Sequence, residues 1–186
     1  MSYIIPTNEL TLTDIKAYRA AAIEAGIVRA LALGLARTRG ELVVRHALPA
    51  TDFGAAIGWA LENYAEAASL GGIWASVFNV GAPVYPTLAN SKVAVFYKFT
   101  DYTVAPAWTG LRFRVGGTGA TTKATFYMQL ELGSKLEPDV YFSEPVIYDP
   151  QDVTFIEAYH AVATAAGGEL FAFGCYIIER LGANIS

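Results

Sequence analysis

The chain has 186 residues and a formal net charge of −4, and 54% of its residues are hydrophobic whereas only 16% are charged. This length fits a single globular domain that needs no disulfide or metal ion to fold, and the single cysteine excludes an intramolecular disulfide. Charged residues usually make up about a quarter of a chain, so an uncharged or apolar surface is expected. Such a surface favours obligate assembly, although a well-filled core beneath a polar, uncharged surface would give the same composition.

The charges are unevenly distributed along the chain. Residues 1–48 hold six basic and four acidic side chains, a net charge of +2, whereas residues 124–186 hold two basic and nine acidic ones, a net charge of −7. Copies with one positive and one negative end can pack head to tail, or the charges can simply solvate loops. The sequence contains no dense basic stripe with interleaved aromatic residues, so we expect no sequence-specific binding of nucleic acid.

The first predicted element is a long helix that runs from about Thr11 to Arg39. The segment opens with side chains that can cap a helix, including Asp14, and it is rich in Ala and Leu and free of proline. Arg37 and Arg39 would lie in the last turn, where positive charge stabilises the helix dipole. Gly40 would then end the helix.

This helix is also the candidate interaction surface. Small residues recur at every fourth position, a spacing that allows close approach of another backbone, and arginines could face a neighbouring subunit or anionic headgroups. In so alanine-rich a segment the spacing also arises by chance, in which case the small residues pack in the chain's own core. The 17 residues from Ala20 to Ala36 include two charges, which is short of the roughly 20 apolar residues of a spanning helix. The candidate interface residues are Ala22, Gly26, Ala30, Gly34, Arg29, Arg37 and Arg39.

Strands are predicted for most of the remaining chain. Residues 50–72 are ambiguous, because Phe53, Ile57 and Leu61 have helical spacing but glycines interrupt them, so a short helix or an irregular loop is expected there. From residue 73 onward, alternating side chains show the two-residue period of half-buried strands. The predicted strands are residues 41–48, 73–80, 93–99, 111–115, 126–132, 140–142, 145–148, 153–162 and 169–181.

Glycine and proline clusters separate these strands. Residues 116–119, Gly-Gly-Thr-Gly, join two alternating segments and predict a hairpin loop rather than a phosphate-binding loop. About eight short strands joined by turns predict a mainly β protein, an antiparallel sandwich or jelly roll with a long N-terminal α-helix. We place the one plausible boundary near Gly40, which gives an N-terminal helical segment, residues 1–40, and a β-sandwich domain, residues 41–186.

The sequence predicts no catalytic residues, no cofactor and no metal ion. His46 and His160 stand far apart, each without another His or Cys nearby. Cys175 alternates with apolar residues and is expected to be a buried small side chain. A group of carboxylates lacks the spacing of a calcium loop, so we expect it to be a solvated edge. These carboxylates are Glu137, Asp139, Glu144, Asp149 and Asp152.

Two other classes of function remain open at this point. A carbohydrate- or ligand-binding sandwich would present an exposed tryptophan that stacks on a sugar ring. An enzyme on a sandwich would place two carboxylates across a groove. The tryptophans are Trp59, Trp74 and Trp108, and the carboxylates on alternating strands are Glu131, Glu157 and Glu179.

The last third of the chain carries a family resemblance. Its segments are Phe-Ser-Glu-Pro at 142–145, Asp-Pro-Gln-Asp at 149–152 and a final strand that ends in Glu-Arg at 179–180. This arrangement resembles the closing strands of small β-sandwich virion proteins: the single jelly-roll capsid proteins of icosahedral, membrane-containing viruses, and the decoration proteins of tailed-phage heads. The resemblance implies a structural protein of the virion, without catalytic residues, that assembles with copies of itself and other capsid proteins. The long helix would then meet a neighbouring subunit or an internal membrane.

Overall fold

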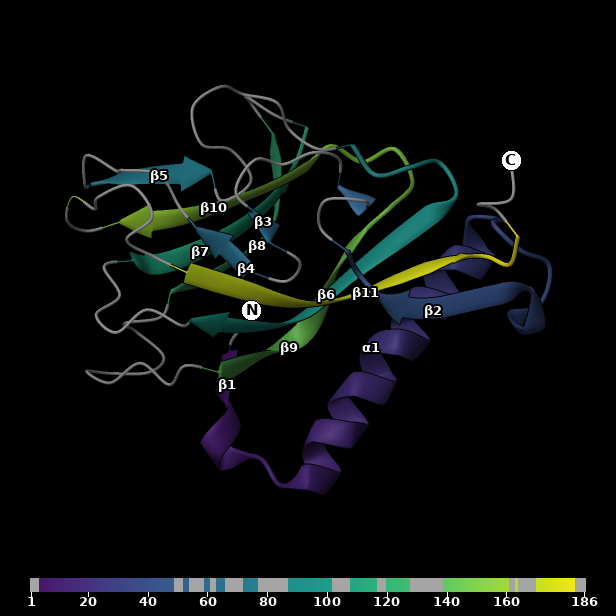
Figure 1. The fold of residues 1–186 in the computed structure, drawn as a ribbon, viewed down its shortest axis with the longest axis horizontal. Coiled ribbons are helices and arrows are strands. Elements are labelled where there is room, and N and C mark those ends of the chain that lie inside the picture. Colours follow the sequence, from purple (N-terminus) through teal and green to yellow (C-terminus); the bar gives the residue numbers. More distant parts are fainter. Residues whose placement is uncertain are drawn as a thin grey trace.

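The computed structural model describes residues 4–48, 52–53, 59–60, 63–65, 72–76, 87–101, 108–116, 120–127, 139–160, 163 and 170–182. Within them the chain is mainly β, as predicted, with two antiparallel sheets and one long helix (Figure 1). The helix α1 spans Leu12–Ala32, and two short 3-10 helices span Thr7–Glu9 and Arg39–Glu41. The strands are β1 Ile4–Pro6, β2 Leu42–His46, β3 Trp59–Ala60, β4 Asn63–Ala65, β5 Ile73–Ser76, β6 Lys92–Asp101, β7 Trp108–Val115, β8 Thr121–Tyr127, β9 Asp139–Tyr148, β10 Thr154–His160 and β11 Leu170–Arg180.

The order of the strands is that of a jelly roll. The four-stranded sheet has the order β5-β10-β7-β8, and the seven-stranded sheet has the order β1-β9-β6-β11-β4-β3, with β2 also paired to β11. The pairs are nested: β7 pairs with β8, β6 with β9, β5 with β10, and both β2 and β4 with β11. A long hairpin rolled into two sheets produces this nesting, which is the jelly-roll architecture. The nested pairs fill eight positions, four in each sheet, because β2 and β4 both lie beside β11. This agrees with the prediction of about eight strands.

Aromatic side chains fill the core between the two sheets. Phe126 of β8 stacks on Phe142 of β9, with ring centroids 4.5 Å apart, and Phe96 of β6 lies 5.5 Å from Phe113 of β7. Each strand buries alternate residues here, because its side chains point to opposite faces of the sheet. Cys175 is buried in this core, as predicted.

A second core lies between α1 and the outer face of the seven-stranded sheet (Figure 1). Ala22, Gly26 and Ala30 are buried on the sheet side of the helix. A Cβ added to Gly26 would lie 2.6 Å from Val95 Cγ2 and 2.3 Å from Ile178 Cδ1. The helix backbone therefore approaches β6 and β11 more closely than any larger residue would allow, and these strands are buried on both faces.

The helix begins where the sequence predicted but ends earlier. Thr11 and Asp14 form a capping box: the Asp14 backbone N–H donates to the Thr11 hydroxyl, and the Thr11 backbone N–H donates to the Asp14 carboxylate. The predicted end at Arg39 and Gly40 is wrong. Gly34 has a φ of +74°, its N–H donates to Leu31 O, and the next N–H donates to Ala30 O. This Schellman motif ends the helix at Ala32 and leaves Arg37 and Arg39 outside it.

Other parts of the strand prediction are confirmed or corrected. Within residues 50–72, where a helix or loop was expected, the described pieces include β3 and β4, which form strands because β4 pairs with β11. The two strands predicted at 140–142 and 145–148 form one strand, β9, with an irregular register against β6 between Phe96 and Lys98. The hairpin between β7 and β8 is confirmed. The boundary near Gly40 remains a prediction; the N-terminal segment contributes β1, which pairs with β9.

Candidate functional site

The predicted small-residue face of the helix contacts the chain's own sheet. Ala22 is 2% exposed and Ala30 is fully buried, and Gly26 lies against Val95 and Ile178. Gly34 is exposed beyond the end of the helix. Ala22, Gly26 and Ala30 therefore pack in the chain's own core, which was one of the two alternatives for this spacing. Any interface on the helix must use its other face.

The candidate arginines lie at the surface, and two of them form ion pairs within the chain. Arg29 donates from Nε to Asp149 Oδ1 at 2.8 Å and from Nη2 to Asp149 Oδ2 at 2.5 Å. Arg39 binds Glu24 on the helix, whereas the exposed Arg37 donates its backbone N–H to a carboxylate oxygen of Glu41. The Arg29 guanidinium lowers the pKa of Asp149 by hydrogen bonding to its carboxylate. The positive charge of residues 1–48 and the negative charge of residues 124–186 are therefore partly neutralised by contacts within one chain.

The solvent face of α1 exposes apolar side chains. Val28, 57% exposed, points away from the buried Ala22, Gly26 and Ala30, whereas Leu12, 67% exposed, and Leu33, 40% exposed, lie at the two ends of the helix. Exposed alanines of the same helix include Ala17, Ala20, Ala21 and Ala32. In the part of the chain that the structure describes, no helix is long and apolar enough to cross a membrane. This face is the surface of the helix that a partner could cover.

The outer face of the four-stranded sheet is covered by the chain's own arginines. Arg112 lies over the ring of Trp74, with its Cζ 4.3 Å from the ring centroid, and donates from Nε to Glu157 Oε2 at 2.7 Å. Arg114 lies over Phe155 and also pairs with Glu157. Glu157 is only 6% exposed, because these guanidinium groups replace its water. The charged groups of Arg112, Arg114 and Glu157 on this face therefore bind one another.

A second charged group lies inside the protein, where β2, β6 and β11 meet. We call it the internal charge cluster, and it consists of Arg45, Asp52, Lys92 and Glu179. Arg45 donates from Nη1 and Nη2 to both oxygens of Asp52, at 2.7 and 2.6 Å, and from Nε to Glu179 at 2.8 Å. Lys92 Nζ donates to Asp52 Oδ1 at 2.8 Å. Two positive and two negative charges balance, as buried charges require.

The backbone N–H of Leu48 also donates to Asp52, at 2.7 Å to Oδ2. Burial opposes ionisation of Asp52, but the hydrogen bonds from Arg45, Lys92 and Leu48 outweigh burial, and the pKa of Asp52 is lowered. Sequence reasoning did not identify this cluster. The available signal was a charged residue next to an apolar run in each of two strands: Lys92 precedes residues 93–97, and Glu179 follows residues 175–178.

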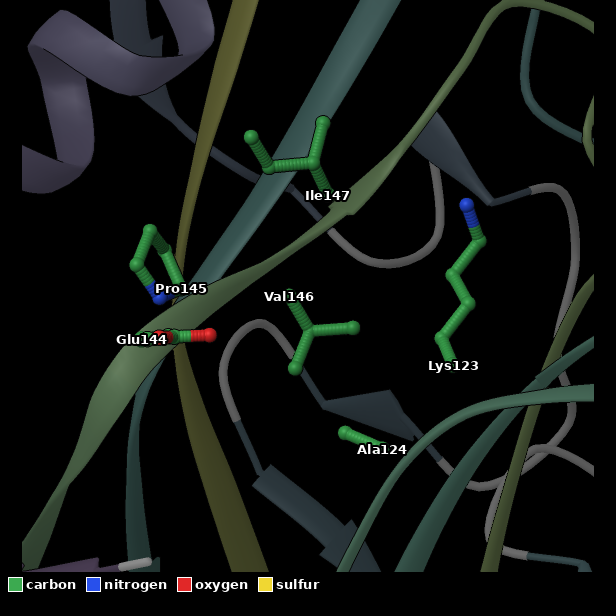
Figure 2. A pocket seen from close by; sticks show the side chains of 6 residues that line it. All are labelled: Lys123, Ala124, Glu144, Pro145, Val146 and Ile147. Atoms are coloured by element: carbon green, nitrogen blue, oxygen red, sulfur yellow. The ribbon is translucent and has the colours of Figure 1, made fainter. Parts of the chain in front are cut away.

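A groove opens between the edges of the two sheets (Figure 2). Its volume is about 310 Å³, and Lys123, Ala124, Glu144, Pro145, Val146 and Ile147 line it. Lys123 forms an ion pair with Asp152 at 3.3 Å and lies over the Tyr148 ring. Lys123, one of the two charged residues that line the groove, is therefore paired within the chain.

The predicted carboxylate group is divided among separate ion pairs. Asp139 accepts from Lys98 at 2.8 Å and binds Thr100. Asp149 binds Arg29, as described above, and Asp152 accepts the Asp149 backbone N–H at 2.9 Å. Glu144 is exposed, and Glu137 lies outside the described residues. The described side chains include no group of three or more His, Cys, Asp or Glu that could hold a metal ion.

The residues of the two alternative functions lie apart. Glu157 is in the four-stranded sheet and Glu179 in the seven-stranded sheet, and each is held by an arginine. Trp74 has Arg112 on its ring and Tyr159 5.4 Å away, so it is not a bare platform for a sugar. His46 is exposed, with its ring 4.9 Å from that of Tyr176. Glu131 and the side chains of Trp59, Trp108 and His160 lie outside the described part.

No known family model matches this chain, and no curated protein matches it in sequence. Solved structures that it resembles include the VP2 subviral particle of infectious bursal disease virus, with a TM-score of 0.33 and 14% identity over 77% of this chain and 34% of that one. The structures of the Gx and Gt strains of the same virus give TM-scores of 0.31 and 0.30, with 14% and 15% identity. The chain spans about a third of the length of these distant viral neighbours, and similarity this low supports no conclusion about function.

Proposed function

We propose that this chain is a structural component of a virus particle, either a capsid or a capsid-decorating protein. It would act in the virion by assembly with copies of itself and with other capsid proteins, without catalysis, a cofactor or sequence-specific binding of nucleic acid. The proposal rests on the jelly-roll architecture, on the exposed apolar side chains of the helix, and on the resemblance of the closing strands to virion proteins described above.

The observation that carries the proposal is a jelly roll whose added helix turns apolar side chains to solvent. Jelly rolls serve as viral capsid domains, and also as lectins and cupins. Lectins and cupins need an open sugar site or a metal site, whereas in the described residues Arg112 lies over the ring of Trp74 and no group of three or more His, Cys, Asp or Glu could hold a metal ion. Val28 and the exposed alanines on the solvent side of the helix instead favour a surface that a partner covers.

Light scattering coupled to size-exclusion chromatography, with negative-stain electron microscopy, tests this proposal over a range of protein concentrations. We expect oligomers or particles whose population rises with concentration. Val28→Lys places a charge in the centre of the exposed helix face and should shift the population toward monomer. Thr122→Lys, at an exposed position on β8, is the matched control and should leave assembly unchanged. A monomer at every concentration would count against the proposal.

The partner of the helix face is either another subunit or an internal membrane. Both surfaces can cover apolar side chains, but binding to anionic vesicles should require the exposed arginines near the end of the helix. Co-sedimentation with anionic and neutral vesicles separates the two. Binding to anionic vesicles that is lost in Arg37→Gln indicates the membrane, and assembly without vesicle binding indicates a neighbouring subunit.

A further inference from the structure

The internal charge cluster brings an amine and a carboxyl group into contact in a buried site. Lys92 Nζ lies 2.8 Å from Asp52 Oδ1, across 40 positions of sequence. Asp52 is 3% exposed, and Lys92 and Glu179 are each 6% exposed. Glu179 Oε2 lies 3.9 Å from the same Lys92 nitrogen. Two reacting groups and a second carboxylate that can move a proton are therefore held together with little access of water.

We propose that Lys92 and Asp52 condense to an isopeptide bond in the folded protein. Glu179 relays one proton from the Lys92 ammonium to Asp52 Oδ1, and the amine nitrogen then attacks the carbon of the neutral carboxyl group. A C–N bond forms and the bond between that carbon and Oδ1 breaks. Oδ1 leaves as water with two protons, the one relayed by Glu179 and one from the nitrogen. The positive and negative charge cancel, and no oxidant or co-reactant is needed.

The donors around Asp52 fit this reaction. Oδ2 accepts from Arg45 Nη1 and from the Leu48 N–H, both at 2.7 Å. These two donors remain in place when Oδ1 leaves, so they can stabilise negative charge on Oδ2 in the tetrahedral intermediate. Lys92 itself contacts Oδ1, the oxygen that departs. Oδ1 also accepts from Arg45 Nη2 at 2.6 Å, so what distinguishes the leaving oxygen is its contact with the attacking amine.

The charge balance of the cluster also favours the product. An ion pair out of water keeps a desolvation cost for each charge. Condensation removes one positive and one negative charge and leaves Arg45 paired with Glu179, so the remaining charges still balance. Burial also keeps out the water that would hydrolyse the new bond. The bond would tie the segment that follows β2 to the start of β6.

A second lysine and aspartate provide an internal comparison. Lys98 Nζ lies 2.8 Å from Asp139 Oδ2, the same separation, but these side chains are 24% and 32% exposed. The described contacts of this pair include no second carboxylate. We therefore expect no bond between Lys98 and Asp139. This inference concerns one folded chain and does not depend on the proposed role in the virion.

Mass spectrometry of the denatured, intact protein tests the inference. We expect the wild-type chain to weigh one water less than its sequence, and a protease digest to yield a branched peptide that joins Lys92 to Asp52. Lys92→Arg keeps the charge but cannot form the bond, and should have the full mass. Lys98→Arg is the matched control and should still lose one water.

Glu179→Gln tests the proton transfer. If Glu179 moves the proton, the fraction of chains with the bond should fall several-fold after the same time in the folded state, while Lys98→Arg should match the wild type. A full mass for the wild-type protein after long incubation in the folded state would overturn the inference, and so would a cross-link mapped to any other pair. The wild-type result decides the question even if a variant fails to fold.

Discussion

Gly26→Ala is expected to destabilise the protein, although the same change in an exposed helix would stabilise it. Alanine gains about 1 kcal/mol over glycine in helix propensity. Against this, the new Cβ would lie 2.3 Å from Ile178 Cδ1 and 2.6 Å from Val95 Cγ2. Overpacking of a core costs about 1–3 kcal/mol. The end of Ile178 can move, but the β-branched Val95 is stiff at χ1, so we expect a cost in the upper part of this range, about 2–3 kcal/mol. Less the gain in helix propensity, the net loss is about 1–2 kcal/mol.

Urea unfolding followed by circular dichroism measures this loss as a change in the midpoint at constant slope. Ala21→Gly, at an exposed position of the same helix, calibrates the propensity term and should cost about 1 kcal/mol. In a Val95→Ala background the stiff methyl group is absent, so Gly26→Ala should there become stabilising. A Gly26→Ala protein as stable as the wild type, or more stable, would refute the close approach of helix and sheet.

Three further predictions follow from single contacts. Thr11→Ala removes the capping box and should cost about 1 kcal/mol, which thermal unfolding detects as a fall in Tm of about 2–4 °C; no change would argue against the cap. Arg29→Gln should raise the pKa of Asp149 in a carboxyl NMR titration. Because that pKa is lowered in the folded chain, the pair adds stability above the ordinary aspartate pKa and loses it as the pH falls through the lowered value. Burial raises the pKa of Cys175, so a thiol reagent should modify it in urea but not in the native protein.

The longer strands were predictable because each carries its own signal, whereas the short strands β1, β3 and β4 were not predicted. Alternation within residues 111–115 and 153–162 set the faces of β7 and β10, and the glycines at 116–119 marked the hairpin between β7 and β8. Nested pairing was not predictable, because it depends on contacts between residues far apart in sequence. A fold class could therefore be predicted from local pattern, whereas the order of strands could not.

The sequence of β6 also contained a signal for the position of the helix. Strand β6 is apolar at consecutive positions from Val93 to Tyr97, and both of its faces are buried. A sheet strand with two apolar faces needs a layer on each side, so β6 itself indicated that something covers the outer face. The early end of α1 had a signal as well, since a glycine followed by leucine, Gly34 and Leu35, is typical of a Schellman motif.

The candidate site was harder to predict than the fold. Small residues at every fourth position, such as Ala22 and Ala30, have the same spacing whether they face a partner or the chain's own sheet. The internal charge cluster joins residues 45, 52, 92 and 179, and no local pattern relates such distant positions. Ion pairs of this kind are visible only after the strands have been placed.

The place of β11 has a consequence for synthesis. This strand is near the carboxyl end of the sequence, yet it pairs with β2, β4 and β6 in the seven-stranded sheet. A chain still emerging from the ribosome lacks β11 until residues 170–180 have been translated, and until then the earlier strands have exposed edges that invite pairing with other chains. Rapid translation of the segment between β6 and β11, or a chaperone that shields those edges, would therefore raise the yield of folded protein.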